Sequence, residues 1–283
     1  MTRFTTCSAR CLAPSAAVLL AALASAPAQA QSLFEIPDEE KETYLDLGVA
    51  VLSRAPYVGS EEDDLGVLPY VNAEYEGRFF FNPAIGAGVN VINRNGFSLA
   101  ALGYFASGRE GDDTPFVPDE DETTLSEAEL DILDEAFEVD GSFTVGGIAS
   151  YTLPFARVDV RGQVPVTGDV DGFRGDVALT TRLPLGRNGF FAPGVRATYT
   201  TDSWNDVYYG ISAEQSALTG LDLFEADDDW TLGAHGIVSF EVGNDISLLG
   251  TVVYSALQGD LKDSPLTPDN DAFTLVGAVI KRF

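Results

Sequence analysis

The side chains best able to carry chemistry in this 283-residue sequence are arginines and aspartates at alternate positions in three polar–apolar segments near its middle. They are Arg157, Asp159 and Arg161, then Arg174, Asp176 and Arg182, and then Arg196. Side chains alternate between the two faces of a strand, so each set shares one face. In a closed barrel that face is the lumen wall. The set then forms either an ion-paired plug or a charged constriction that selects ions, and five arginines against two aspartates would favour anions there.

Enzyme chemistry has weak support in the sequence. The one histidine is His235, and Ser247 in the next segment could point to the same side, which leaves a Ser–His hydrolase open beside a packed polar histidine. The sequence has no G-x-S-x-G, C-x-x-C or H-E-x-x-H motif. We therefore predict no catalytic residues, no enzymatic activity and no cofactor.

Acidic side chains gather in three short runs, at 61–64, 119–122 and 227–229. Such oxygens could bind Ca²⁺ or Mg²⁺ that bridges to lipopolysaccharide, or they could form solvated surfaces. None of the runs has the spacing of an EF-hand loop, and we predict no resident metal. The formal net charge of −28 argues against nucleic acid as a partner, because binding nucleic acid needs a basic surface.

These side chains are positioned by segments of alternating polarity that are separated by turn residues from Tyr44 onward. After residue 30 no run of 18 apolar residues occurs, so a membrane could be crossed only by a closed sheet. Long connections at 108–139, 201–229 and 257–271 alternate with tight turns, and the chain ends on Phe283. We predict an all-β fold, an antiparallel up-and-down barrel of about 12 strands in the outer membrane. The expected strands are 44–54, 65–75, 78–82, 85–92, 97–107, 140–153, 156–164, 173–183, 190–200, 230–241, 245–256 and 272–283.

The start of the chain has the pattern of a cleaved signal peptide over residues 1–30. Arg3 and Arg10 precede an apolar run, and Ala28-Gln29-Ala30 is the expected cleavage site. Residues 31–43 are expected to form a short periplasmic segment before the barrel at 44–283. Both cysteines lie in the signal peptide, so the mature chain would contain no disulfide.

Two loop features have alternative interpretations. Ser126 and Glu129 form a capping box before apolar residues at helical spacing, which indicates a short surface helix or a disordered acidic loop. Trp204, Tyr208 and Tyr209 could contact a partner, close over the barrel mouth, or continue strand 190–200 as aromatics of the membrane interface.

The barrel segments resemble the MltA-interacting protein/outer membrane protein V (MipA/OmpV) family. The similar segments lie at 44–51, 56–62, 78–81, 88–92, 209–217, 263–266 and 281–283, and YGISAEQSA at 209–217 is the most specific. The resemblance implies an outer-membrane barrel that brings a murein hydrolase and a murein synthase together at the inner face of the outer membrane. Members are also discussed as adhesins and as pores, and the family implies no catalytic residues. Outer-membrane lipid and lipopolysaccharide are the other expected partners.

Overall fold

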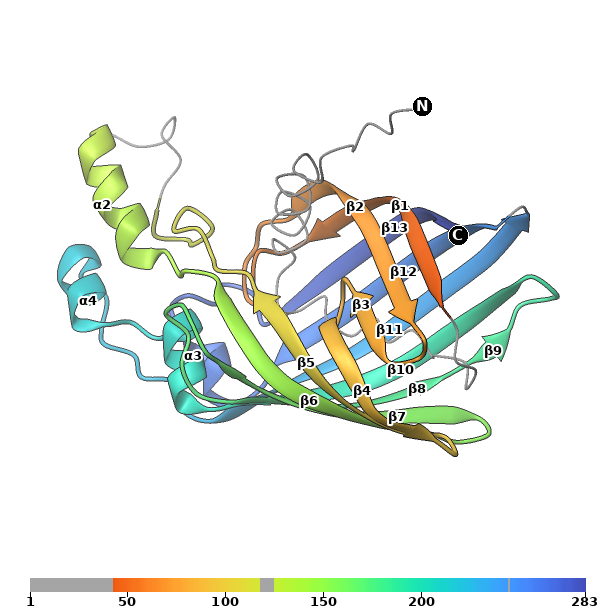
Figure 1. The fold of residues 1–283 in the computed structure, drawn as a ribbon. Helices are drawn as coiled ribbons and strands as arrows, with labels where there is room; N and C mark the ends of the chain where they lie inside the picture. Colours follow the sequence, from red (N-terminus) through yellow and green to blue (C-terminus); the bar gives the residue numbers. More distant parts are fainter. Residues whose placement is uncertain (1–42, 118–124, 244) are drawn as a thin grey trace, which may run out of the picture.

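The structure, a computed structural model, describes residues 43–117, 125–243 and 245–283. Its thirteen strand segments form one antiparallel sheet that closes on itself, because β11 pairs with both β12 and β10. β8 and β9 both pair with β10 as two parts of one interrupted strand, so the ring has twelve strands (Figure 1). The strands are β1 (Tyr44–Arg54), β2 (Asp64–Tyr75), β3 (Phe79–Asn82), β4 (Gly86–Arg94), β5 (Phe97–Ala106), β6 (Ser142–Thr152), β7 (Ala156–Pro165), β8 (Arg174–Thr181), β9 (Leu183–Pro184), β10 (Gly189–Thr200), β11 (Asp229–Gly243), β12 (Ile246–Leu257) and β13 (Asp271–Arg282).

The predicted fold class is confirmed, and each predicted strand has its counterpart in the ring. One segment differs in detail, because the strand expected at 173–183 is interrupted at Arg182. On β10, Pro193 stands directly beyond Gly194, the partner of Thr180, so the ladder lacks an N–H donor next to the interruption. Residues 1–30 and all of 31–43 except Thr43 lie outside the described residues, so the predicted signal peptide and periplasmic segment remain predictions.

The alternation of side chains separates an apolar exterior from a polar interior. On β8, Val177 and Leu179 are 47% and 46% exposed, whereas Asp176, Ala178 and Thr180, which alternate with them, are buried. A water-soluble sheet would bury the valine and leucine, since each buried side chain of this size contributes about 1.5–3 kcal/mol. An exposed apolar wall around a polar interior is the arrangement that a lipid surround stabilises.

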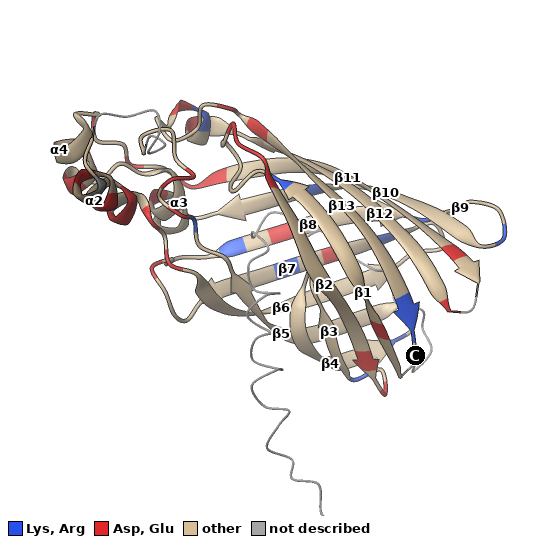
Figure 2. Cartoon of the chain, turned by 90° about the horizontal axis from the view of Figure 1, so that it is seen from above, with Lys and Arg blue, Asp and Glu red and all other residues tan. Residues whose placement is uncertain are grey.

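Long and short connections lie at opposite ends of the barrel. The long ones carry α2 (Glu127–Phe137), α3 (Asp202–Tyr209), α4 (Ala213–Thr219) and the 3-10 helix η1 (Gly259–Asp263). Figure 2 shows that Asp and Glu gather at this loop end. The predicted capping box forms, since Glu129 Oε2 accepts a hydrogen bond from the backbone N–H of Ser126 at 2.9 Å, and the helix interpretation is confirmed. None of the helices in the described part of the chain is both long and apolar enough to cross a bilayer.

One stretch of the wall is incomplete. β3 has four residues and pairs with β2 only at Ala73–Tyr75, whereas β1 pairs with β2 from Asp64 to Glu74. At 64–72, no strand of the described chain pairs with the other edge of β2. Pro69 lies in this stretch, where a residue without an N–H is tolerated.

The ends of the chain complete the ring. β1 and β13 pair from Asp46↔Arg282 to Arg54↔Thr274. Beyond that ladder the Leu45 N–H donates to the Phe283 carbonyl at 3.4 Å, and the Phe283 N–H donates to the Leu45 carbonyl at 2.9 Å. The start of β1 and the end of β13 therefore both lie at the short-turn end.

Candidate functional site

The predicted charged face lies on three neighbouring strands, β7, β8 and β10. Register places Arg161 opposite Asp176, and Asp176 opposite Thr198 on the other side. The side chains of the set on these strands are buried except that of Arg182. The period of two therefore brings together Arg157, Asp159, Arg161, Arg174, Asp176 and Arg196.

Asp176 is the centre of the network. Arg161 donates to Asp176 Oδ2 from Nη2 at 2.8 Å and from Nε at 3.1 Å. The hydroxyl of Thr198 donates to Asp176 Oδ1 at 2.8 Å. Arg174 and Arg196 lie at 3.6 Å and 3.9 Å from the same Oδ1 atom. One carboxylate thus serves three guanidinium groups, all buried from water.

A second ion pair lies beside it on β7. Arg157 Nε donates to Asp159 Oδ1 at 2.7 Å, and Arg157 Nη2 donates to the Ser150 hydroxyl at 2.8 Å. Ser150 on β6 also donates to Asp159, at 2.5 Å. Sequence reasoning missed this serine, because its position opposite Asp159 depends on the β6–β7 register.

The structure places Arg182 apart from the network. It is exposed in the interruption between β8 and β9, and its guanidinium carbon lies 4.1 Å from the centre of the Phe190 ring.

The possible Ser–His pair is not formed. His235 is opposite Val253 on β12, whereas Ser247 is opposite Glu241, six residues further along β11. Six residues of strand span roughly 20 Å, so the hydroxyl lies far out of reach of the imidazole. His235 is buried, and its Nε2 lies 3.0 Å from the Thr180 hydroxyl across Gly194. This is the packed polar histidine of the alternative interpretation.

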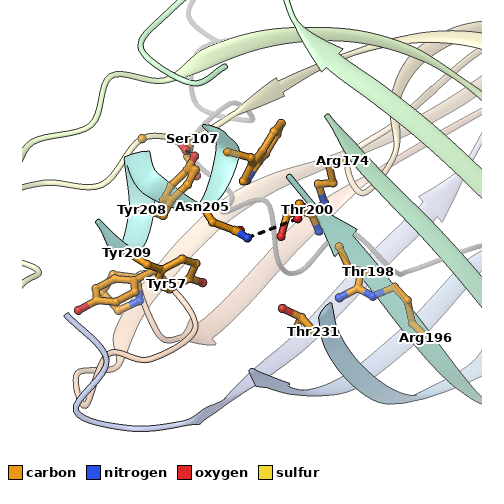
Figure 3. A pocket seen from close by; sticks show the side chains of 13 residues that line it. Tyr57, Ser107, Arg174, Arg196, Thr198, Thr200, Asn205, Tyr208, Tyr209 and Thr231 are labelled. Carbon is orange, nitrogen blue, oxygen red and sulfur yellow. Dashed lines mark hydrogen bonds between the residues drawn. The ribbon is translucent and has the colours of Figure 1, made fainter. Parts of the chain in front are cut away.

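The mouth at the loop end is covered by α3, a helix that the sequence did not predict. Three side chains of this helix, those of Trp204, Asn205 and Tyr209, are buried. The preferred interpretation, that Trp204, Tyr208 and Tyr209 continue the strand 190–200, is therefore wrong. Asn205 Nδ2 donates to the carbonyls of Thr200 at 3.3 Å and Asp227 at 2.7 Å. The two bonds tie α3 to the end of β10 and to the segment before β11, and Figure 3 shows the bond to Thr200.

Arg109 connects the cover to the loop after β5. Its guanidinium donates to the carbonyls of Tyr208 at 2.5 Å and Phe137 at 3.0 Å, and stacks 5.3 Å above the centre of the Tyr57 ring. Burial lowers the pKa of Arg109 and raises the pKa values of Tyr57 and Tyr208 to about 12. The tyrosines are therefore neutral at any physiological pH, and the cation at the cover is not balanced by a phenolate.

The acidic run at 227–229 has structural partners. Asp228 accepts hydrogen bonds from the backbone N–H of Asp202 at 2.7 Å and from the Tyr199 hydroxyl. Residues 119–122 lie outside the described residues. Across 43–117, 125–243 and 245–283, no three His, Cys, Asp or Glu side chains are grouped as a metal site would need.

The fold and its polar interior define an outer-membrane β-barrel. The family model described as MltA-interacting protein MipA matches residues 47–283, and the chain belongs to this family. The putative outer membrane protein YiaT of Escherichia coli K12 is 25% identical over 259 residues, which cover 89% of this chain and 97% of that protein. The MltA-interacting protein of the same strain is 31% identical over 74 residues, 26% of this chain and 30% of that protein.

Solved barrels are similar at lower identity. The translocator domain of the autotransporter NalP from Neisseria meningitidis is 11% identical with a TM-score of 0.45, covering 96% of each chain. An outer membrane channel from Pseudomonas putida F1 is 10% identical with a TM-score of 0.44, covering 88% of this chain and 100% of that one. The relatives named as outer-membrane proteins place this chain in the outer membrane.

Proposed function

We propose that this barrel is a non-enzymatic scaffold that holds a murein hydrolase of the MltA type at the periplasmic, short-turn end. The family description and the name of one relative supply the partner class. The observation that carries the proposal is the unequal distribution of charge between the two ends (Figure 2). A murein synthase is the second partner that the family resemblance implies.

The short-turn end carries exposed side chains of both signs. Arg94 ends β4 there and Arg187 stands in the turn before β10, and Glu76 and Asp245 stand in neighbouring turns; all four are exposed. At the loop end the exposed side chains are mostly carboxylates, with Lys262 as an exposed exception. A mixed surface suits protein contact, whereas dense negative charge repels acidic partners.

The size of the short-turn end fits one partner at a time. Twelve strands 4.8 Å apart and tilted by about 40° form a ring roughly 24 Å across, or roughly 34 Å with side chains. Its end therefore offers on the order of 900 Å², close to the roughly 800 Å² that each protein contributes to a standard interface. We propose that hydrolase and synthase bind in turn, or that one of them reaches the other through its own surface.

The alternative function, a narrow diffusion pore, has less support. α3 lies across the mouth, and Arg161 and Asp176 fill the lumen beside β7 and β8. An adhesin would use the acidic loops, and these loops together with the apolar wall are where we propose contact with lipopolysaccharide and outer-membrane lipid. Planar-bilayer recording separates scaffold from pore, because steady conductance with an anion-selective reversal potential would favour the pore.

The scaffold is tested by charge reversal at the two ends. Arg94→Glu and Arg187→Glu each reverse an exposed positive charge at the short-turn end, and Lys262→Glu makes the same change at the loop end. We expect the first two to slow association with a purified MltA-type hydrolase roughly two- to tenfold, most strongly at low salt, because rim charges act on the rate of encounter. Lys262→Glu should bind like the wild type. Equal binding by all four proteins, or no binding by the wild type, would refute the proposal.

A further inference from the structure

The edge of β2 that faces away from β1 leaves backbone groups unpaired in the wall. Leu45 and Phe283 exchange two hydrogen bonds, so odd-numbered residues of β1 point their N–H and C=O groups at β13 and even-numbered ones at β2. Through the β1–β2 register, the odd-numbered residues of β2 point theirs away from β1. At this open edge, which no strand of the described chain covers, they are Leu65, Val67, Pro69 and Val71. Each unpaired backbone group in hydrocarbon costs several kcal/mol, so the edge favours a partner that forms hydrogen bonds.

An apolar groove begins on the outer face beside the same part of β2. It has a volume of about 520 Å³, with Leu65 at one end on β2 and Phe191 at the other on β10. Register aligns Gly277 with Val51 on one side and with Gly250 on the other, so the floor crosses neighbouring strands in a row. A Cβ at Gly277 would meet nothing within 4 Å, which leaves the floor open to a ligand.

The groove descends from the loop end toward the middle of the wall. Leu65 is the second residue of β2, Gly277 the seventh of β13 and Val238 the tenth of β11, and all three strands start at the loop end. The five strand spacings from β2 to β10 span roughly 24 Å, and a strand tilt of about 40° makes this course drop about 15 Å. That drop is about half of the 30 Å hydrocarbon core, so the groove crosses one leaflet. It is the outer leaflet, because the long loops of such barrels are extracellular.

We propose that one lipopolysaccharide molecule is bound at Leu65, with one acyl chain in the groove and its acyl linkages on the open edge of β2. The ester and amide carbonyls of these linkages accept from the N–H groups of Leu65 and Val67. The amides also donate to the carbonyls of the edge, which the esters of a phospholipid cannot do. A second copy of the barrel in the same membrane could not form an antiparallel ladder here, because both β2 strands would run inward from the loop end.

This site deepens the contact with lipopolysaccharide proposed above and rests on that contact, not on the scaffold role. Native mass spectrometry of the refolded protein in detergent counts the retained lipid, with no hydrolase present. Purified lipopolysaccharide or phosphatidylethanolamine is added at equal concentration with Mg²⁺, which screens repulsion between phosphate groups and the carboxylates at 61–64. We expect one retained lipopolysaccharide and about fivefold less phosphatidylethanolamine. Equal retention of the two lipids would overturn the proposal.

Two variants locate the groove. Gly277→Leu fills the open floor, so the barrel should form while retention of lipopolysaccharide falls about fivefold or more. Ala101→Leu adds apolar bulk at an exposed position of β5 outside the groove and should leave retention unchanged. Equal retention by the two variants would overturn the proposal. A dimer of the wild type that Gly277→Leu turns into a monomer would also overturn it, because the groove would then belong to a second copy.

Val67→Pro tests the open edge separately. It removes an N–H from that edge alone, where Pro69 already lacks one, so the ladder with β1 stays intact. Retention of lipopolysaccharide should fall, and unchanged retention would refute the role of the edge. If a variant fails to fold, the wild type still decides, because a lipid that binds only the folded state raises its unfolding temperature. An unfolding temperature that is the same with lipopolysaccharide and with phosphatidylethanolamine would overturn the proposal.

Discussion

Replacing Asp176 with Asn tests the buried network most directly. The change removes a carboxylate that lies 2.8 Å from Arg161, 3.6 Å from Arg174 and 3.9 Å from Arg196, and it keeps the size of the side chain. Removing one partner of a buried ion pair costs about 3–5 kcal/mol, because the remaining charge stays buried. The amide oxygen of Asn can still accept one hydrogen bond, so we expect a loss of about 3 kcal/mol in the free energy of unfolding.

The assay is urea unfolding of the protein in lipid vesicles, followed by tryptophan fluorescence. Asp171→Asn makes the same chemical change at an exposed position and should alter the free energy by less than about 0.5 kcal/mol. Adding Arg161→Met to Asp176→Asn removes one uncompensated cation and should recover part of the loss. A loss below about 1 kcal/mol for Asp176→Asn, or no recovery in the double variant, would refute this account of the network.

Two further predictions concern closure of the ring and a titrating loop. Gly48→Ala should cost about 1–3 kcal/mol in unfolding free energy or prevent insertion, because the new Cβ would lie 2.2 Å from the Val279 carbonyl oxygen; Gly277→Ala, where a Cβ meets nothing within 4 Å, should be neutral, and equal effects of the two would contradict the prediction. Burial, with Asp64 and Asp112 nearby, raises the pKa of Asp113 to about 6 in the folded protein, above its pKa of about 4 in the unfolded chain. The folded loop therefore loses stability as the pH rises from about 4 through 6 and Asp113 loses its proton. Asp113→Asn should remove that pH dependence, which is worth at most about 1 kcal/mol after solvent screening. Amide hydrogen exchange of residues 107–117 measures it, and a stability of this loop that changes with pH equally in both proteins would contradict the prediction.

The strands and the charged lumen face were predictable because polar and apolar residues alternate along the sequence with a period of two. Arg161 and Asp176 meet because both stand at lumen-facing positions of adjacent strands. The cover was not predictable in the same way. α3 has eight residues, too few for a helical period to be distinguished from an interface aromatic cluster, and its stability comes from contacts such as those of Asn205 with Thr200 and Asp227.

Contacts that depend on register were also beyond the sequence. Ser150 joins the Arg157–Asp159 pair because β6 and β7 align it with Asp159, and a slip of one residue would turn it outward. The placement of Arg182 depends on the interruption of a strand whose polarity pattern continues without a break.

The pairing of β1 with β13 has a consequence for biogenesis. Asp46 and Arg282, joined by hydrogen bonds of 2.7 Å and 2.8 Å, are 236 residues apart in the chain. Until β13 has been synthesised, the polypeptide can form only an open sheet with two unpaired edge strands. Each of these edges can pair with the backbone of another chain. To reach the membrane without aggregating, the unfolded protein therefore has to be bound by a chaperone. The chaperone has to release it only where β1 and β13 can pair.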